Sequence, residues 1–147
     1  MRKLNVIGAL GLALCLGTSP AIAEPHSYHI SAKELLSYCQ DTLAMMNHKQ
    51  YNVSKSSWCI GFIQGSVTSH RFYSTFYAVQ DPQNKGLADN ELGKKVEANQ
   101  VFCVPSSVTL GVIVKDVDSF IEQNPQYQGE QASMVVARAL NKKYSCR

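Results

Sequence analysis

The sequence lacks the motifs by which many enzymes are recognised. It has no phosphate-binding loop, no paired zinc motif and no dinucleotide fingerprint. It also lacks the glycine-flanked serine of the hydrolase nucleophile elbow. No internal repeat occurs, and no second long apolar segment follows the N-terminal region. We therefore expect no cofactor, no bound metal and no membrane span in the mature chain.

An excess of charge of either sign is also missing. The chain has 14 basic and 11 acidic residues, a formal net charge of +3. The net charge falls to +1 if Arg2 and Lys3 leave with an export signal. Domains that bind nucleic acid need a clustered basic face, so this near-neutral balance argues against a nucleic-acid partner.

The N-terminus has the three parts of a secretory signal peptide. Arg2 and Lys3 supply the charged start, an apolar run follows to about Leu16, and Ala21-Ile22-Ala23 ends in small residues. A membrane anchor is the alternative, but a bilayer span needs roughly 20 apolar residues. We expect residues 1–23 to be a cleaved signal peptide and residues 24–147 to form one exported domain.

Hydrophobic spacing predicts two helices in the first half of this domain. The first begins at a capping box formed by Ser31 and Glu34 and fades before Asn47. Residues 51–55 are expected to be a loop, and the second helix to start at residue 56 or 57 and continue to at least Arg71. One face of the second helix carries small residues four apart. Unless the spacing is chance, it predicts that another backbone approaches closely. These residues are Ser57, Gly61, Gly65 and Ser69.

Two further helices are predicted in the second half. The third starts at Thr109 and ends at Asn124, because a residue before proline avoids the helical region. The fourth spans about residues 130–143, with Lys142 and Lys143 at the end where cations are favoured. Between the two halves, residues 80–100 form a charged insert with turn signals and room for a short helix over 88–98.

The cysteines predict two disulfides. Cys15 leaves with the signal, and an even number of cysteines in an exported chain indicates disulfide bonds. Four cysteines allow three pairings. The short turn between the third and fourth helices makes them antiparallel, which brings Cys103 close to Cys146 and leaves Cys39 for Cys59. The predicted fold is all-α, a small bundle of about four to five helices with two disulfides.

Catalytic residues are hard to find in this pattern. Disulfide formation removes the cysteines as nucleophiles, and His26 and His29 lie near the mature N-terminus without further ligands. A hydrolase would have to use Ser66, Ser69 and His70. We therefore predict no catalytic residues and favour binding over catalysis.

Ordered cysteine motifs give the chain a resemblance to a known family. It resembles the Rap/Tai family of periplasmic immunity proteins of type VI secretion. The resemblance rests on Leu35-Leu36-Ser37-Tyr38-Cys39, Trp58-Cys59-Ile60-Gly61-Phe62-Ile63-Gln64-Gly65, Phe102-Cys103-Val104-Pro105-Ser106-Ser107-Val108-Thr109-Leu110-Gly111, Asn124-Pro125, Ala139-Leu140 and Tyr144-Ser145-Cys146. One departure is Val112, where many relatives have glutamine.

The resemblance implies a partner and a mode of action. Such proteins are helical, often homodimeric, and protect a bacterium from a secreted effector that enters the periplasm. That effector is a peptidoglycan amidase with a papain-like cysteine, blocked sterically by protruding loops. The alternative is a periplasmic acid-stress chaperone, which would expose apolar surface as its carboxylates protonate near pH 2–3.

The residues expected to contact the effector are chosen because they should be exposed, and not because they match positions of the family. The long insert is the first choice, because long connections between packed helices are often functional. A solvated surface without a partner is the alternative. The turn over residues 126–131 is the second choice. The insert residues expected to contact the effector are Asp81, Asn84, Lys85, Asp89, Glu91 and Lys94.

Overall fold

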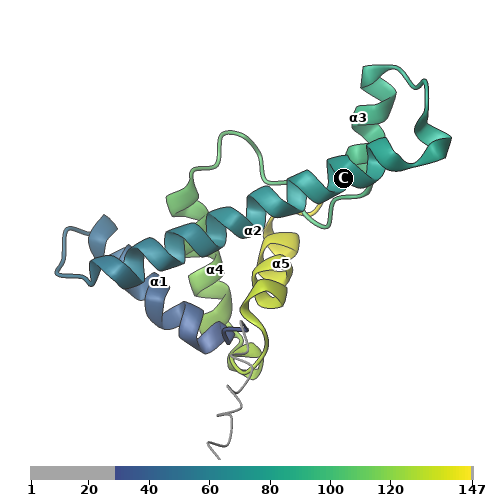
Figure 1. Cartoon of the computed structure of the whole chain (residues 1–147). Helices are drawn as coiled ribbons and strands as arrows, with labels where there is room; N and C mark the ends of the chain where they lie inside the picture. Colours follow the sequence, from purple (N-terminus) through teal and green to yellow (C-terminus); the bar gives the residue numbers. More distant parts are fainter. Residues whose placement is uncertain (1–28, 147) are drawn as a thin grey trace, which may run out of the picture.

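Five α-helices and two short 3-10 turns form the part of the chain that the computed structural model describes, residues 29–146 (Figure 1). The all-α prediction is confirmed, and the short helix expected in the insert is present as α3. The predicted signal peptide lies outside the described residues. The elements in order are α1 (Ala32–Met46), α2 (Val53–Gln80), η1 (Pro82–Asn84), α3 (Asp89–Ala98), α4 (Leu110–Gln123), η2 (Pro125–Tyr127) and α5 (Ala132–Lys143).

The core lies between α1, α2, α4 and α5. Each of these helices turns an apolar stripe inward, and each contributes fully buried side chains to the core. α3 contributes no buried residue and lies at the far end of α2, away from this bundle (Figure 1). The fully buried side chains of the bundle include Leu35, Ile63, Val117, Val135 and Leu140.

The two disulfides join the expected partners. Cys39 of α1 is bonded to Cys59 of α2, and Cys103 before α4 is bonded to Cys146 after α5. The Cys103 N–H also donates to the Tyr144 carbonyl at 2.7 Å, so the segment before α4 runs beside the end of α5. The hairpin argument for this pair is therefore confirmed.

α1 begins as predicted, whereas α2 begins earlier and extends further. The capping box at Ser31 and Glu34 is present. The prediction of a loop over residues 51–55 is wrong beyond Asn52, because α2 already begins at Val53. The Asn52 side chain caps α2 by accepting the Lys55 N–H at 3.0 Å. Asp41 of α1 fixes this start, because its carboxylate accepts the Asn52 N–H at 2.7 Å.

The small-residue face of α2 does not approach another backbone of this chain. A Cβ added at Gly61 or at Gly65 would meet nothing within 4 Å. Both glycines are exposed. The close contact predicted from their spacing is therefore absent from the described part of the chain.

Candidate functional site

An arm projects beyond the four-helix bundle. It consists of the second half of α2, η1 and α3, residues 71–98, and it extends past the bundle in Figure 1. Leu87, Leu92 and Val96 are the half-buried apolar residues of its η1–α3 part. This geometry makes the arm the most prominent protrusion of the described structure.

Polar contacts fasten the base of the arm to the segment that returns to α4. The Arg71 guanidinium donates to the Val104 carbonyl at 2.8 Å. The Val101 N–H donates to Nε2 of His70 at 3.0 Å, and the His70 ring stacks on Phe102. Burial lowers the pKa of His70, while a backbone hydrogen bond at Phe102 opposes that shift. A neutral imidazole can accept the Val101 N–H bond, so this link at the base of the arm can form when His70 is neutral.

Three residues of the arm are buried inside it. Ser74 and Ala78 are buried on the side of α2 that faces α3, and the Ser74 hydroxyl is within hydrogen-bond distance of the His70 and Asn99 carbonyls. Asn84 donates to the Ala78 carbonyl at 2.8 Å and is 9% exposed. The expectation that Asn84 is exposed is wrong, because its amide donates to a carbonyl in the last turn of α2 that lacks a helical partner.

The other predicted insert residues lie on the surface of the arm. Lys85, Asp89, Glu91 and Lys94 are exposed. Asp81 is also exposed, and its carboxylate accepts the Gln83 N–H at 2.9 Å, which caps η1. The structure thus brings these five side chains onto one projecting element. Their contact with a partner stays a prediction.

An aromatic patch on the arm was not identified from the sequence as a surface feature. Phe72, Tyr73, Phe76 and Tyr77 are between 45% and 63% exposed. The rings contact one another in two rows, Phe72 on Phe76 and Tyr73 on Tyr77, with centroids 6.0 and 6.3 Å apart. Contiguous exposed apolar patches of this kind mark protein–protein interaction sites. The spacing predicted a helix here, but it did not show that these rings lie beyond the core.

The second predicted contact region lies at the opposite end of the molecule. The turn over residues 126–131 supports the start of α1 through its backbone. The Lys33 N–H donates to the Gln128 carbonyl and the Ala32 N–H to the Glu130 carbonyl, each at 2.9 Å. The turn therefore has a structural use.

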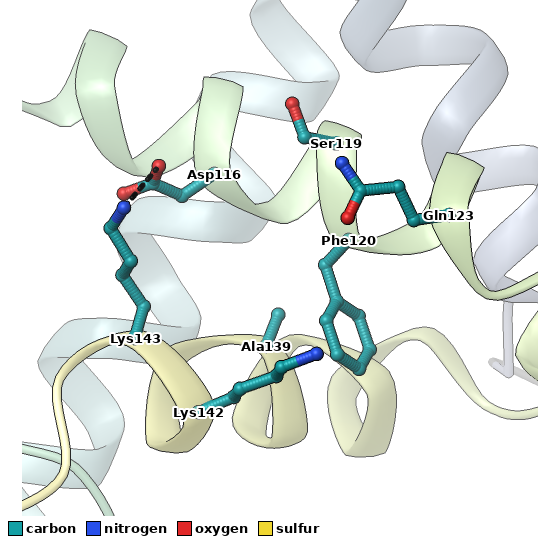
Figure 2. A pocket seen from close by; sticks show the side chains of 7 residues that line it. All are labelled: Asp116, Ser119, Phe120, Gln123, Ala139, Lys142 and Lys143. Carbon is teal, nitrogen blue, oxygen red and sulfur yellow. Dashed lines mark ion pairs between the residues drawn. The ribbon is translucent and has the colours of Figure 1, made fainter.

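In a groove of about 260 Å³ between α4 and α5, the charged side chains already interact with other groups of the chain (Figure 2). Lys143 Nζ lies 3.8 Å from Asp116, and the Tyr144 hydroxyl donates to the same carboxylate. Burial, and then this bond, raises the pKa of Tyr144 to about 12. Lys142 lies over the Phe120 ring. With these groups engaged, the groove offers weaker recognition than the arm does.

The residues proposed for a hydrolase line a different groove, between α2 and α5. The Ser66 hydroxyl donates to the Phe62 carbonyl at 2.8 Å, and His70 Nε2 accepts the Val101 N–H. A serine nucleophile needs its hydroxyl directed at a basic nitrogen. Both groups are instead engaged with the backbone, which gives the hydrolase alternative no support.

Comparison with protein families gives a match that covers most of the chain. The model of the Rap1a immunity proteins matches residues 31–146, from the α1 cap to the last cysteine. The chain belongs to the Rap1a immunity protein family. Neither a curated protein nor a solved structure matches it.

Membership of the Rap1a family supports an immunity role and confirms the resemblance seen in the cysteine motifs. Proteins of this family are generally not enzymes and typically work in the periplasm. Within residues 29–146, no helix is long and apolar enough to cross a membrane.

Proposed function

We propose that this Rap1a-family protein is a periplasmic immunity protein that binds a type VI secretion effector and blocks it sterically. The proposed effector is a peptidoglycan amidase. The observation that carries the proposal is the family match over residues 31–146. The arm supports it, because blocking an enzyme cleft requires an element that projects from a stable body.

The arm has the surface chemistry expected of such a blocking element. Tyr73 and Tyr77 present large rings with polar hydroxyls, the residue type enriched in interface hot spots. Asp81, Lys85 and Asp89 are also exposed on the arm and carry charges of both signs, which can orient a partner and discriminate against others. The effector is therefore proposed to contact the tyrosine row and the polar end of the arm.

The test is binding and inhibition with a purified amidase effector. We expect the oxidised protein to bind it with a nanomolar Kd and to stop peptidoglycan cleavage. Replacing both Tyr73 and Tyr77 by alanine should weaken binding by at least about 100-fold, since hot-spot residues contribute about 2 kcal/mol or more each. The matched control is Tyr51→Ala, an exposed tyrosine on the loop between α1 and α2.

Two results would count against the proposal. One is that no amidase effector is inhibited and no cell expressing such an enzyme in its periplasm is rescued. The other is that the tyrosine variant binds as tightly as the Tyr51→Ala control, which would remove the arm from the interface. Suppression of aggregation near pH 3, measured by light scattering without any inhibition, would favour the chaperone alternative.

A further inference from the structure

A pocket of about 560 Å³ lies between the second half of α1 and α4. Pockets that bind small molecules are typically about 300–1,000 Å³, so a small ligand has room here. The pocket is beside the end of α1, where α2 begins, and the arm lies at the other end of α2 (Figure 1). A ligand in it would therefore be separate from the contacts proposed for the effector. The polar side chains that line it are Gln40, Lys49, Lys115, Asp118, Ser119 and Glu122, together with Asn47.

One carboxylate of this lining is buried without a partner. Asp118 is 4% exposed, and its Oδ1 accepts no hydrogen bond from any group of residues 29–146. The ion pairs of the described chain all involve other carboxylates. Buried charges in proteins are normally paired or hydrogen-bonded. The unpaired state of Asp118, at the wall of a pocket, indicates that its partner is a group from outside the chain.

Two neighbouring features make a cationic partner favourable. Glu122 lies one helical turn after Asp118 on α4 and lines the same pocket. The last turn of α1 also reaches the pocket, and the C-terminal end of a helix carries partial negative charge. That turn contains no basic residue to offset its charge. An ammonium group in the pocket would interact favourably with both carboxylates and with the helix end.

Two lysines on the same lining define the other half of the ligand. Lys49 follows α1, and Lys115 lies one turn before Asp118 on α4. Both are exposed, and neither forms an ion pair within residues 29–146. The two lysines balance the two carboxylates, so the charged lining is neutral when all four are ionised. A ligand that carries both signs of charge complements such a lining better than a cation alone does.

We propose that the α1–α4 pocket binds a small zwitterion of the amino acid or short peptide class. Its ammonium group would lie at the Asp118 carboxylate, beside Glu122 and the end of α1. Its carboxylate would lie toward Lys49 and Lys115. The two oxygens of Asp118 share one charge and exchange places by rotation of the carboxylate, so an ammonium group on the pocket side compensates the whole group.

The titration of Asp118 is consistent with this role. Burial, and then the charge of Glu122, raises the pKa of Asp118 to about 6. An ammonium group stabilises the ionised carboxylate, so binding lowers this pKa and releases a proton when Asp118 starts protonated. The other titratable side chains of the lining are Glu122, Lys49 and Lys115. We expect the affinity for the zwitterion to fall as the pH is lowered from 7 to 5.

Titration calorimetry of the oxidised protein with alanine, glutamine and the dipeptide alanylalanine tests the proposal. At least one of the three should bind at pH 7 with a Kd tighter than about 10 mM. N-acetylation of the ligand that binds removes its ammonium group and should weaken binding by about 10-fold or more, the effect of losing a hydrogen bond to a charged group. Amidation removes its carboxylate and should weaken binding by a smaller factor, because the lysines are exposed and screened by salt.

A matched pair of variants locates the site. Asp118→Asn keeps the shape of the side chain and removes its charge. It should weaken binding on the order of 10–100-fold and flatten the pH dependence between pH 5 and 7. Asp116→Asn is the control, because Asp116 is a carboxylate of the same helix that lines the α4–α5 groove instead. It should bind the zwitterion like the wild type.

Three results would overturn the inference. One is that none of the three probes binds. Another is that the N-acetylated or the amidated ligand binds as tightly as the parent compound, which would remove one of the two proposed charge contacts. The third is that Asp118→Asn and Asp116→Asn bind equally well. No effector is present in these measurements, so their failure is distinct from a failure of the immunity proposal.

Discussion

At the scale of single residues, Asp118 is a buried carboxyl group with an unpaired oxygen. Its side chain is 4% exposed on α4, and its Oδ1 is the one buried side-chain oxygen or nitrogen within residues 29–146 that has no hydrogen-bond partner. Burial raises the pKa of Asp118 to about 6, and the nearby Glu122 adds to the shift. An ionised Asp118 is therefore unfavourable in the folded protein.

This raised pKa predicts how stability depends on pH. Because the folded pKa lies above the unfolded value, Asp118 binds its proton more tightly in the folded state. Its favourable contribution is complete below about pH 4 and is lost as the pH rises through about 6. We expect Asp118→Asn to be more stable than the wild type by about 1–3 kcal/mol at pH 8 and to lose that advantage by pH 4.

Urea denaturation of both proteins between pH 4 and 8 measures this difference. Asp116→Asn is a useful comparison, because Asp116 lies on the same helix and accepts a bond from Tyr144. It should be less stable than the wild type at pH 8. A difference between wild type and Asp118→Asn that does not change with pH would contradict the prediction.

At the scale of elements, the arm depends on one amide. Asn84 connects η1 to the last turn of α2 through the Ala78 carbonyl. We expect Asn84→Ala to leave that buried carbonyl unpaired, at a cost of about 1–3 kcal/mol. Since α3 has no buried residue, the loss should appear as local opening of the arm rather than unfolding of the bundle.

Limited trypsin digestion can detect this opening. Cleavage after Lys85 and Lys94 should accelerate several-fold in Asn84→Ala, while the urea midpoint of the bundle changes little. Asn90→Ala is the control, because Asn90 is an exposed asparagine in the same region. Equal cleavage rates in the two variants would show that Asn84 does not hold the arm.

The elements also show where prediction from sequence succeeded. α1 was predicted correctly because its capping box and its hydrophobic period are local signals. The start of α2 was missed because its cap, Asn52, is positioned by a hydrogen bond to Asp41 of another helix, which is a tertiary contact. The length of α2 depends on α3 packing beside Ser74 and Ala78, which is a tertiary contact.

At the scale of the whole molecule, the two disulfides should contribute unequally. Cys103–Cys146 spans 43 residues and Cys39–Cys59 spans 20. A longer loop loses more freedom in the unfolded chain when it is closed, in the chain-entropy model. Replacing both cysteines of the longer loop by serine should therefore destabilise the protein by about 0.7 kcal/mol more than replacing the shorter pair.

Equilibrium unfolding of the two double variants under oxidising conditions measures this order. Each variant should lose about 2–4 kcal/mol relative to the wild type. Full reduction of the wild type should cost more than either double variant. A larger loss from the Cys39–Cys59 pair would mean that native packing around α1, rather than loop length, dominates.

The sequence by itself determined the helical class, the disulfide pairing and the family. These follow from signals that can be read in the sequence: periodicity, capping, a short turn that makes two helices antiparallel, and the order of cysteine motifs. The tertiary structure alone decided which surfaces are free. Helical spacing shows that Phe72 and Phe76 share a face, but not that the bundle ends before reaching them. The tertiary structure also shows that Asn84, which was expected to be exposed, is buried and supports the arm from inside. The sequence could not show this, because burial depends on neighbours distant in the chain.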